Sequence, residues 1–237
     1  MIYNVNYSTF GGAIRNGDMI AVGNIVEFMR KSHNNNDIKF YMDPSSINSS
    51  DYVQQFFSFL KSNTDYFSEV KGDIDLPWKK VNAWDFRDIS GDLVKIKNDK
   101  KQLKKIVVFP IVDAPYNVYR NWPVEVFQSI IQTYSSEEYK DYQKIICISP
   151  NLQINKIEGW EISTDFMTNI DHIMTSEIFV GGDTGTSHFA WALDKGPKEL
   201  MYYISGRGLL HCLPFYLLEG RGKVIKYWLN LEGTTFE

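Results

Sequence analysis

Apolar residues follow two spacings along this chain of 237 residues, and the spacings predict strands and helices in alternation. Short unbroken apolar runs predict buried strands, whereas apolar residues three or four positions apart predict helices. The predicted strands are 2–8, 38–42, 81–84, 106–110, 145–148, 160–162, 178–180, 199–204 and 224–229. The predicted helices begin near positions 19, 51, 123, 165 and 187. This alternation is typical of an α/β protein with mostly parallel sheets.

The segment 177–193 combines a predicted strand, a glycine-rich turn and a predicted helix. The first N–H groups of a helix have no partner within it, and with the helix dipole they attract anions. Glycines let a phosphate approach the backbone, and four side chains can add donors: Thr184, Thr186, Ser187 and His188. The alternative is an ordinary strand-to-helix connection, with Asp183 or Thr184 as the N-cap.

The same segment resembles a known family. Its sequence Asp183-Thr184-Gly185-Thr186-Ser187-His188, with Ala192 after it, is similar to the D-T-G-x-x-H-x-x-x-A signature of the heptosyltransferases. These are sugar-nucleotide enzymes of the two-domain GT-B fold. The resemblance implies that residues 183–188 bind the diphosphate of a nucleotide-sugar donor.

A second segment, Arg120-Asn121-Trp122-Pro123, resembles the Lys/Arg-x-Trp-Pro segment of the same family. Proline suits the first turn of the helix that follows. The resemblance implies that Arg120 faces the donor phosphates and that Trp122 packs in the core beneath it. A surface ion pair is the alternative role for Arg120.

A third resemblance is the pair Gly17-Asp18, which ends the glycine-rich loop 9–18. The family carries a Gly-Asp pair just before its first helix, and its aspartate is the proposed catalytic base. The resemblance therefore implies that Asp18 removes a proton from the acceptor hydroxyl. The alternative is that Asp18 caps the helix. Arg207, in the loop after the strand 199–204, is a further candidate for contact with phosphate or acceptor, although its match to the family is loose.

The highly charged stretch 91–105 predicts a solvated linker between two domains. We therefore expect two Rossmann-like domains, 1–98 on the acceptor side and 103–237 on the donor side, with a cleft between them as in the GT-B fold. The opening strand, loop and helix lack the G-x-G-x-x-G fingerprint, so an NAD site is not supported. Asp73-Ile74-Asp75 matches the metal-binding D-x-D of another glycosyltransferase fold, but nearby Lys71, Gly72 and Pro77 favour an exposed loop instead.

Composition and charge limit the kinds of partner and cellular compartment that we expect for this protein. The net charge of -4 gives no overall basic footprint for nucleic acid, although clusters at 95–105 and 207–223 could supply a local basic groove. The two cysteines, Cys147 and Cys212, lack metal-type spacing and suggest a reducing compartment. No apolar run approaches the roughly 20 residues of a membrane span, and the N-terminus does not read as a signal peptide. We expect a cytoplasmic protein, and its richness in Asn, Lys, Ile and Tyr is typical of AT-rich genomes, including phages.

The resemblance to heptosyltransferases implies a metal-independent, inverting glycosyltransferase with a nucleotide sugar as substrate and no separate cofactor. The acceptor would be a glycan or a hydroxymethylated base of phage DNA. Two alternatives remain open: a non-catalytic nucleotide-sugar-binding module, which would not depend on Asp18, and a nucleotide-sugar epimerase of the same architecture, which would need no acceptor.

Overall fold

The computed structural model describes residues 2–5, 13–69, 95–110, 121–149, 151–182, 184–206, 223–231 and 234–235, the last strands by their backbone alone. The chain divides into two compact units, Met1–Lys97 and Asn98–Glu237. Each unit has its own parallel strand pairing and its own buried core. None of the helices within the described ranges is long and apolar enough to cross a lipid bilayer.

The second unit is built on one sheet with the order β5-β4-β3-β6-β7-β8-β9. Its strands are β3 (Leu103–Phe109), β4 (Gln143–Cys147), β5 (Glu161–Ser163), β6 (Ser176–Gly181), β7 (Glu199–Gly206), β8 (Lys223–Leu231) and β9 (Thr234–Thr235). Every pairing is parallel except β8 with β9. The order from β5 to β8 is that of a Rossmann-like sheet, in which the connection reverses between β3 and β6. The predicted α/β class with a mostly parallel sheet is confirmed.

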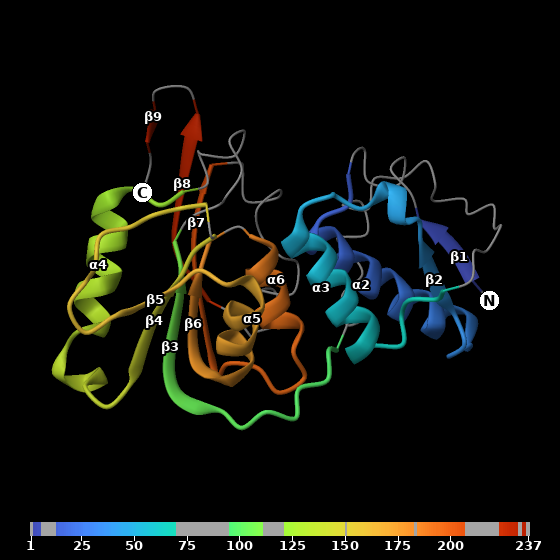
Figure 1. The fold of residues 1–237 in the computed structure, drawn as a ribbon, viewed down its shortest axis with the longest axis horizontal. Helices are drawn as coiled ribbons and strands as arrows, with labels where there is room; N and C mark the ends of the chain where they lie inside the picture. The colour runs from blue at the N-terminus through green and yellow to red at the C-terminus, as the bar shows by residue number, and fades with distance from the viewer. Residues whose placement is uncertain are drawn as a thin grey trace. The chain divides into compact units, whose positions relative to one another are not determined.

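Helices cover both faces of this sheet (Figure 1). One face carries α4 (Val124–Tyr134), and the other carries α5 (Phe166–Thr175) and α6 (Gly185–Ala192); the short 3-10 turn η5 (Glu137–Tyr139) follows α4. Because side chains alternate along a strand, β3 serves both faces. Ile106 and Val108 join the core with α4, whereas the ring of Phe109 lies 6.1 Å from that of Phe179. Both faces are therefore buried, as the continuous apolar run predicted.

The first unit contains a parallel β–α–β arrangement. Strand β1 (Ile2–Val5) pairs with β2 (Lys39–Met42), and α2 (Asn16–His33) connects them; the 3-10 turn η1 (Pro44–Ser46) and α3 (Asp51–Asn63) follow. Arg30 of α2 is buried, and its Nε donates to the Ile38 carbonyl at 3.0 Å while Nη1 donates to Asp65 at 3.0 Å. This arginine connects the helix to the residue before β2 and to the segment after α3.

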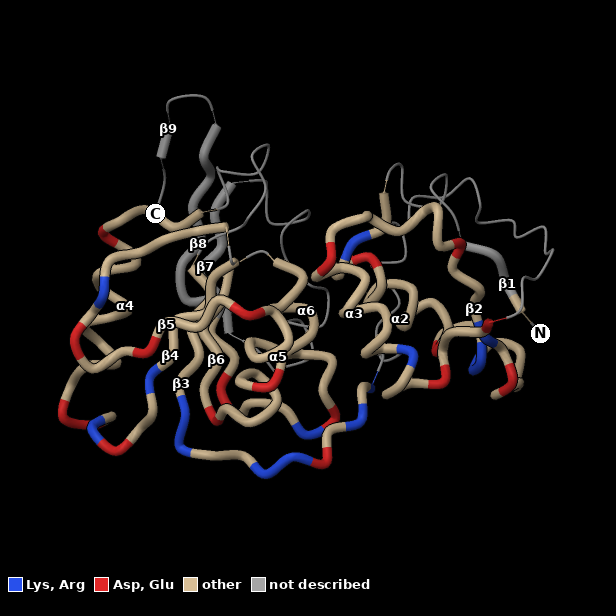
Figure 2. Tube along the Cα trace, viewed as in Figure 1, with Lys and Arg blue, Asp and Glu red and all other residues tan. Residues whose placement is uncertain are grey.

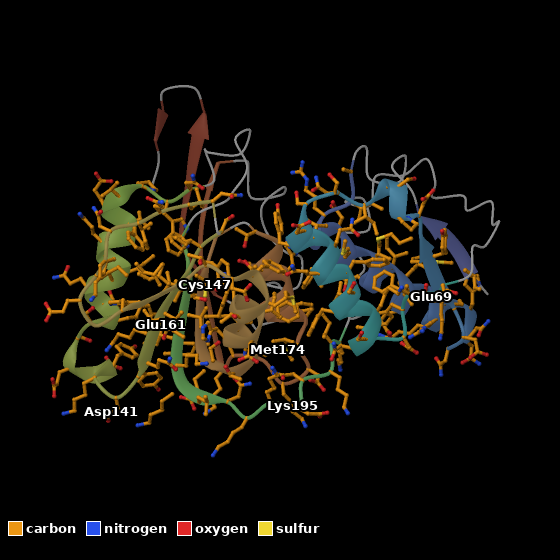
Figure 3. All side chains as sticks on the ribbon, viewed as in Figure 1. Glu69, Asp141, Cys147, Glu161, Met174 and Lys195 are labelled. Carbon is orange, nitrogen blue, oxygen red and sulfur yellow. The ribbon has the colours of Figure 1, made fainter. Side chains whose placement is uncertain are left out.

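The charged stretch before β3 is not wholly solvated, which corrects the prediction for its described part. Figure 2 shows several basic positions along it. Asn98 is nevertheless fully buried, and its Nδ2 donates to the carbonyls of Met174 at 2.8 Å and Lys195 at 2.6 Å, both labelled in Figure 3. An amide that satisfies two carbonyls can be buried despite charged neighbours. The predicted strand 81–84 and the Asp73/Asp75 pair lie outside the described residues.

Candidate functional site

The glycine-rich turn lies at the carboxyl end of β6, where the order of the sheet reverses. In open parallel sheets, ligands bind outside the carboxyl ends of the strands at this reversal. Helix α6 starts directly from the turn, so its N-terminus lies at the same edge. The predicted strand, turn and helix are all present, and the sheet places them at a preferred position for a ligand.

Hydroxyl groups organise the turn from within. Thr184 is the N-cap of α6, and its Oγ1 accepts a hydrogen bond from the Ser187 N–H at 3.3 Å. Thr184 Oγ1 also lies 2.7 Å from Thr186 Oγ1. The Ser187 hydroxyl donates to the Gly182 carbonyl at 2.6 Å. Capping by Thr184 is thus confirmed, and the three hydroxyls hold the turn together instead of all pointing outward.

Two backbone amides remain at this helix start. The N–H groups of Ser187 and His188 both bond the Thr184 carbonyl, at 3.1 and 3.3 Å. Within the described residues, those of Gly185 and Thr186 have no hydrogen-bond partner. They belong to the first turn of a helix, whose dipole is positive at this end. The turn therefore offers anion-binding backbone groups more than hydroxyl donors.

Gly181 allows α6 to lie close to the strand, a packing role in addition to the phosphate approach that the sequence predicts for the glycines of this turn. A Cβ atom at this position would lie 2.6 Å from Ser187 Oγ and 2.6 Å from Phe179 Cε1. Neither distance is tolerated, so only glycine fits without a shift. The glycine pair 181–182 in the sequence was the available signal.

His188 is the fourth residue of α6 and is 9% exposed. A histidine placed this deeply belongs partly to the packing of the helix, whatever its ligand role. Asp183, Arg120 and Arg207 lie outside the described residues. Trp122, which the sequence predicts beneath Arg120, is buried in the core with Val126 and Ile130 of α4.

Asn169 is a residue that sequence reasoning missed. It lies near the start of α5, is 2% exposed, and its Nδ2 donates to the Ile148 carbonyl at 3.2 Å. A carbonyl only accepts, so this bond fixes the amide orientation and leaves Oδ1 facing elsewhere. That oxygen is buried and has no partner among the described residues. A buried acceptor without a donor is a candidate ligand contact.

The strand registers relate Asn169 to the turn. Val108 pairs with Ile146 on one side and Val180 on the other, so Ile148 and Gly182, each two residues further along, lie at one level of the sheet. They are separated by two strand spacings, about 10 Å. Asn169 binds the first carbonyl and Ser187 binds the second. Asn169 and the turn therefore both lie at the carboxyl edge of the sheet.

Gly17 and Asp18 belong to the first unit, and the structure places both inside the first turn of α2. The helix was predicted to begin near 19, but it begins at Asn16 because Asp18 Oδ2 accepts a hydrogen bond from the Arg15 N–H at 2.9 Å. This bond closes the first turn. Arg15, not Asp18, is the N-cap residue, so the predicted N-cap position is wrong; Asp18 is the third residue of the helix, and its carboxylate stabilises the helix start by accepting from the N–H of the N-cap residue. A catalytic role would come in addition.

Among the described residues, no three side chains of His, Cys, Asp or Glu gather closely enough to hold a metal ion. Comparison with protein-family models, with curated proteins and with solved structures finds no match to this chain. The resemblance to heptosyltransferases therefore rests on the three sequence motifs alone.

Proposed function

We propose that the protein is an inverting glycosyltransferase that uses a nucleotide sugar without a metal ion. The observation that carries the proposal is the position of the β6–α6 turn, which presents a helix N-terminus at the reversal point of a Rossmann-like sheet. Anionic phosphates are attracted to such a helix start, and nucleotides occupy this edge in many α/β proteins. The three heptosyltransferase-like motifs support the same assignment, and with it the GT-B architecture.

The donor diphosphate would accept hydrogen bonds from the N–H groups of Gly185 and Thr186. Thr184 and Ser187 keep these amides in place through the internal hydroxyl bonds. Asp183, Arg120, His188 and Arg207 complete the proposed donor site, with the cationic side chains offsetting phosphate charge. The ribose or base would reach Asn169, whose Oδ1 accepts a hydrogen bond from a hydroxyl or amino group.

In the proposed reaction, an acceptor hydroxyl attacks the anomeric carbon of the bound sugar. The bond from that carbon to the acceptor oxygen forms while the bond to the diphosphate oxygen breaks, which inverts the anomeric centre. Asp18 takes the hydroxyl proton, and the nucleoside diphosphate leaves with its added charge stabilised by the helix N-terminus. The acceptor is a glycan or a hydroxymethylated DNA base.

The hydrogen bond between Asp18 and the Arg15 N–H favours a second candidate. If Asp18 only stabilises the start of α2, the same donor site would belong to a nucleotide-sugar-binding module without catalysis. The two candidates share the donor site and differ in turnover.

The decisive experiment measures binding first and transfer second. Nucleoside diphosphates, nucleotide sugars and inorganic pyrophosphate are tested by calorimetry and thermal shift in the presence of EDTA. Ligand at about 100 times its dissociation constant is expected to stabilise the fold by roughly 2.7 kcal/mol. Absence of binding to all of them would overturn the donor site. Binding followed by transfer to oligosaccharide or hydroxymethylated DNA supports the enzyme, and binding without transfer to either supports the module.

A further inference from the structure

A buried amino group lies on the α5 face of the sheet, remote in sequence from the β6–α6 turn. Lys105 of β3 is only 4% exposed, although lysine is rarely buried unless it is paired. Its Nζ donates to Thr175 Oγ1 at 2.7 Å and lies 3.3 Å from His172 Nδ1. Both partners lie in the second half of α5. Within the described residues Lys105 forms no ion pair, so its charge is not neutralised by direct contact.

The contact with Lys105 restricts the protonation state of His172. An ammonium group has donors but no lone pair, so the imidazole must accept at Nδ1 and carry its proton on Nε2. Nε2 is buried and has no partner among the described residues. A doubly protonated imidazole would direct an N–H at the ammonium group and place two positive charges side by side in a buried position. The contact therefore accommodates a charged lysine with a neutral histidine, but not two cations.

We propose that the Lys105–His172 contact makes the packing of α5 on β3 sensitive to acid: α5 stays packed while His172 is neutral, and protonation of His172 releases it. The contact then acts as a pH-dependent latch on this helix. The proposal does not rest on the proposed nucleotide site, although Asn169 of that site lies on the same helix.

Other titratable groups around Lys105 and His172 do not remove the repulsion that would arise if both side chains were positively charged. Asp171, on α5 itself, forms an ion pair with Lys100, and Glu161 on β5 accepts a hydrogen bond from Gln143 at 3.1 Å. Figure 3 labels both Cys147 on β4 and Glu161. Burial raises the pKa of the Cys147 thiol, so this group stays neutral. Burial, and then the charge of Lys105, lower the pKa of His172 against the opposing effect of Glu161 and Asp171. Burial likewise lowers the pKa of Lys105.

The direction of the effect follows from proton uptake. A histidine whose pKa is lower in the packed state binds its proton more readily when α5 is released. The stabilisation is complete above the ordinary histidine pKa of about 6.5 and is lost as the pH falls from there toward the lowered value. Between pH 7.5 and 5.5, one such histidine raises the opening equilibrium constant by up to about tenfold. The shift of Lys105 has the same sign but acts at alkaline pH.

Hydrogen exchange of backbone amides tests the proposal on the full chain. After correction for the intrinsic pH dependence of exchange, amides of α5 should open up to about tenfold more often at pH 5.5 than at pH 7.5. Amides of α4, on the opposite face of the same sheet, should change little. An equal change in both helices, or none in α5, would overturn the proposal.

Two matched variants separate this pair from other titrating groups. His172→Asn retains an acceptor for Lys105 but cannot titrate, so the acid response of α5 should disappear. His33→Asn makes the same replacement at an exposed histidine in the last turn of α2, and the response should persist. An acid response that survives in His172→Asn contradicts the proposal. If that variant does not fold, the ring-proton NMR titration of His172 in the unmodified chain decides: its midpoint should lie below the ordinary histidine pKa of about 6.5, and a midpoint at or above that value overturns the proposal.

Discussion

The Ser187 hydroxyl donates a hydrogen bond to the carbonyl oxygen of Gly182 across 2.6 Å, and this bond closes the turn between β6 and α6. A side chain that the motif assigns to the donor is thus committed to the turn itself. In the proposed site, the hydroxyl groups therefore hold the backbone of the turn in place, and the backbone amides bind the ligand. This division of roles makes the effects of individual substitutions distinguishable.

Gly181→Ala is expected to destabilise the second unit. The added Cβ would lie 2.6 Å from Ser187 Oγ and 2.7 Å from Phe179 Cζ, so strand or helix must shift. Overpacking of this kind costs about 1–3 kcal/mol in the free energy of unfolding, which urea denaturation can measure. In a Ser187→Ala background one of the two clashes is absent, so Gly181→Ala should cost less there. Strictly additive costs in the double variant would contradict this packing account.

Thr184→Ala removes the N-cap oxygen of α6. The Ser187 N–H loses its side-chain acceptor, and the expected loss is about 0.5–2 kcal/mol of unfolding free energy. Because the cap also orients the amides of Gly185 and Thr186, affinity for inorganic pyrophosphate should fall as well. Thr184→Ser is the matched control, since it keeps the hydroxyl and should retain both properties. Calorimetry of each variant with pyrophosphate provides the measurement.

The sequence predicts most elements of the fold because buried strands and amphipathic helices leave local patterns. Strands β3, β4, β6, β7 and β8 and helices α3, α4 and α5 all overlap their predicted positions closely. The N-cap role of Thr184 is also local, since cap and donor are three residues apart. Such features depend only on residues that are close in sequence, so they can be predicted from the sequence of one chain.

What the sequence did not reveal depends on contacts between distant segments. Asn98 is buried because carbonyls at Met174 and Lys195 lie opposite it, and nothing in the charged stretch indicates this. Asn169 becomes a candidate only when the registers place Ile148 level with the β6 turn. The start of α2 was missed for a different reason: glycine in a first turn reads as a loop, although the Asp18 bond to Arg15 closes a helix there.

Asn169→Ala should separate nucleoside recognition from phosphate recognition. The variant loses the unpartnered Oδ1, so affinity for a nucleoside diphosphate is expected to fall roughly threefold to tenfold, as for one net hydrogen bond. Affinity for inorganic pyrophosphate should not change, because the amides of Gly185 and Thr186 are untouched. The ratio of the two dissociation constants is the informative quantity, because a general loss of stability would affect both ligands. Equal weakening of both would remove Asn169 from the proposed site.

Asp18 is the residue on which the choice between enzyme and binding module depends. Its Oδ2 accepts a hydrogen bond from the Arg15 N–H at 2.9 Å, so removal of the side chain disturbs α2 whatever its chemistry. Asp18→Ala alone would therefore mislead, since lost activity could follow from a frayed helix. Asp18→Asn keeps an amide oxygen that can accept from Arg15 but is far too weak a base to take a proton from an acceptor hydroxyl. The pair of variants separates stabilisation of the helix start from base catalysis.

For a catalytic Asp18, Asp18→Asn is expected to keep nearly the original unfolding free energy and donor affinity but to lose about 10²- to 10⁴-fold in transfer rate, the usual contribution of a general base. Asp18→Ala should lose the same rate and, in addition, about 1 kcal/mol of stability with the hydrogen bond. Single-turnover transfer at saturating donor, together with urea denaturation, gives both quantities. Near-normal transfer by Asp18→Asn would show that Asp18 only stabilises the start of α2. The amide can accept the hydrogen bond from the Arg15 N–H, but it cannot take the proton that the reaction requires.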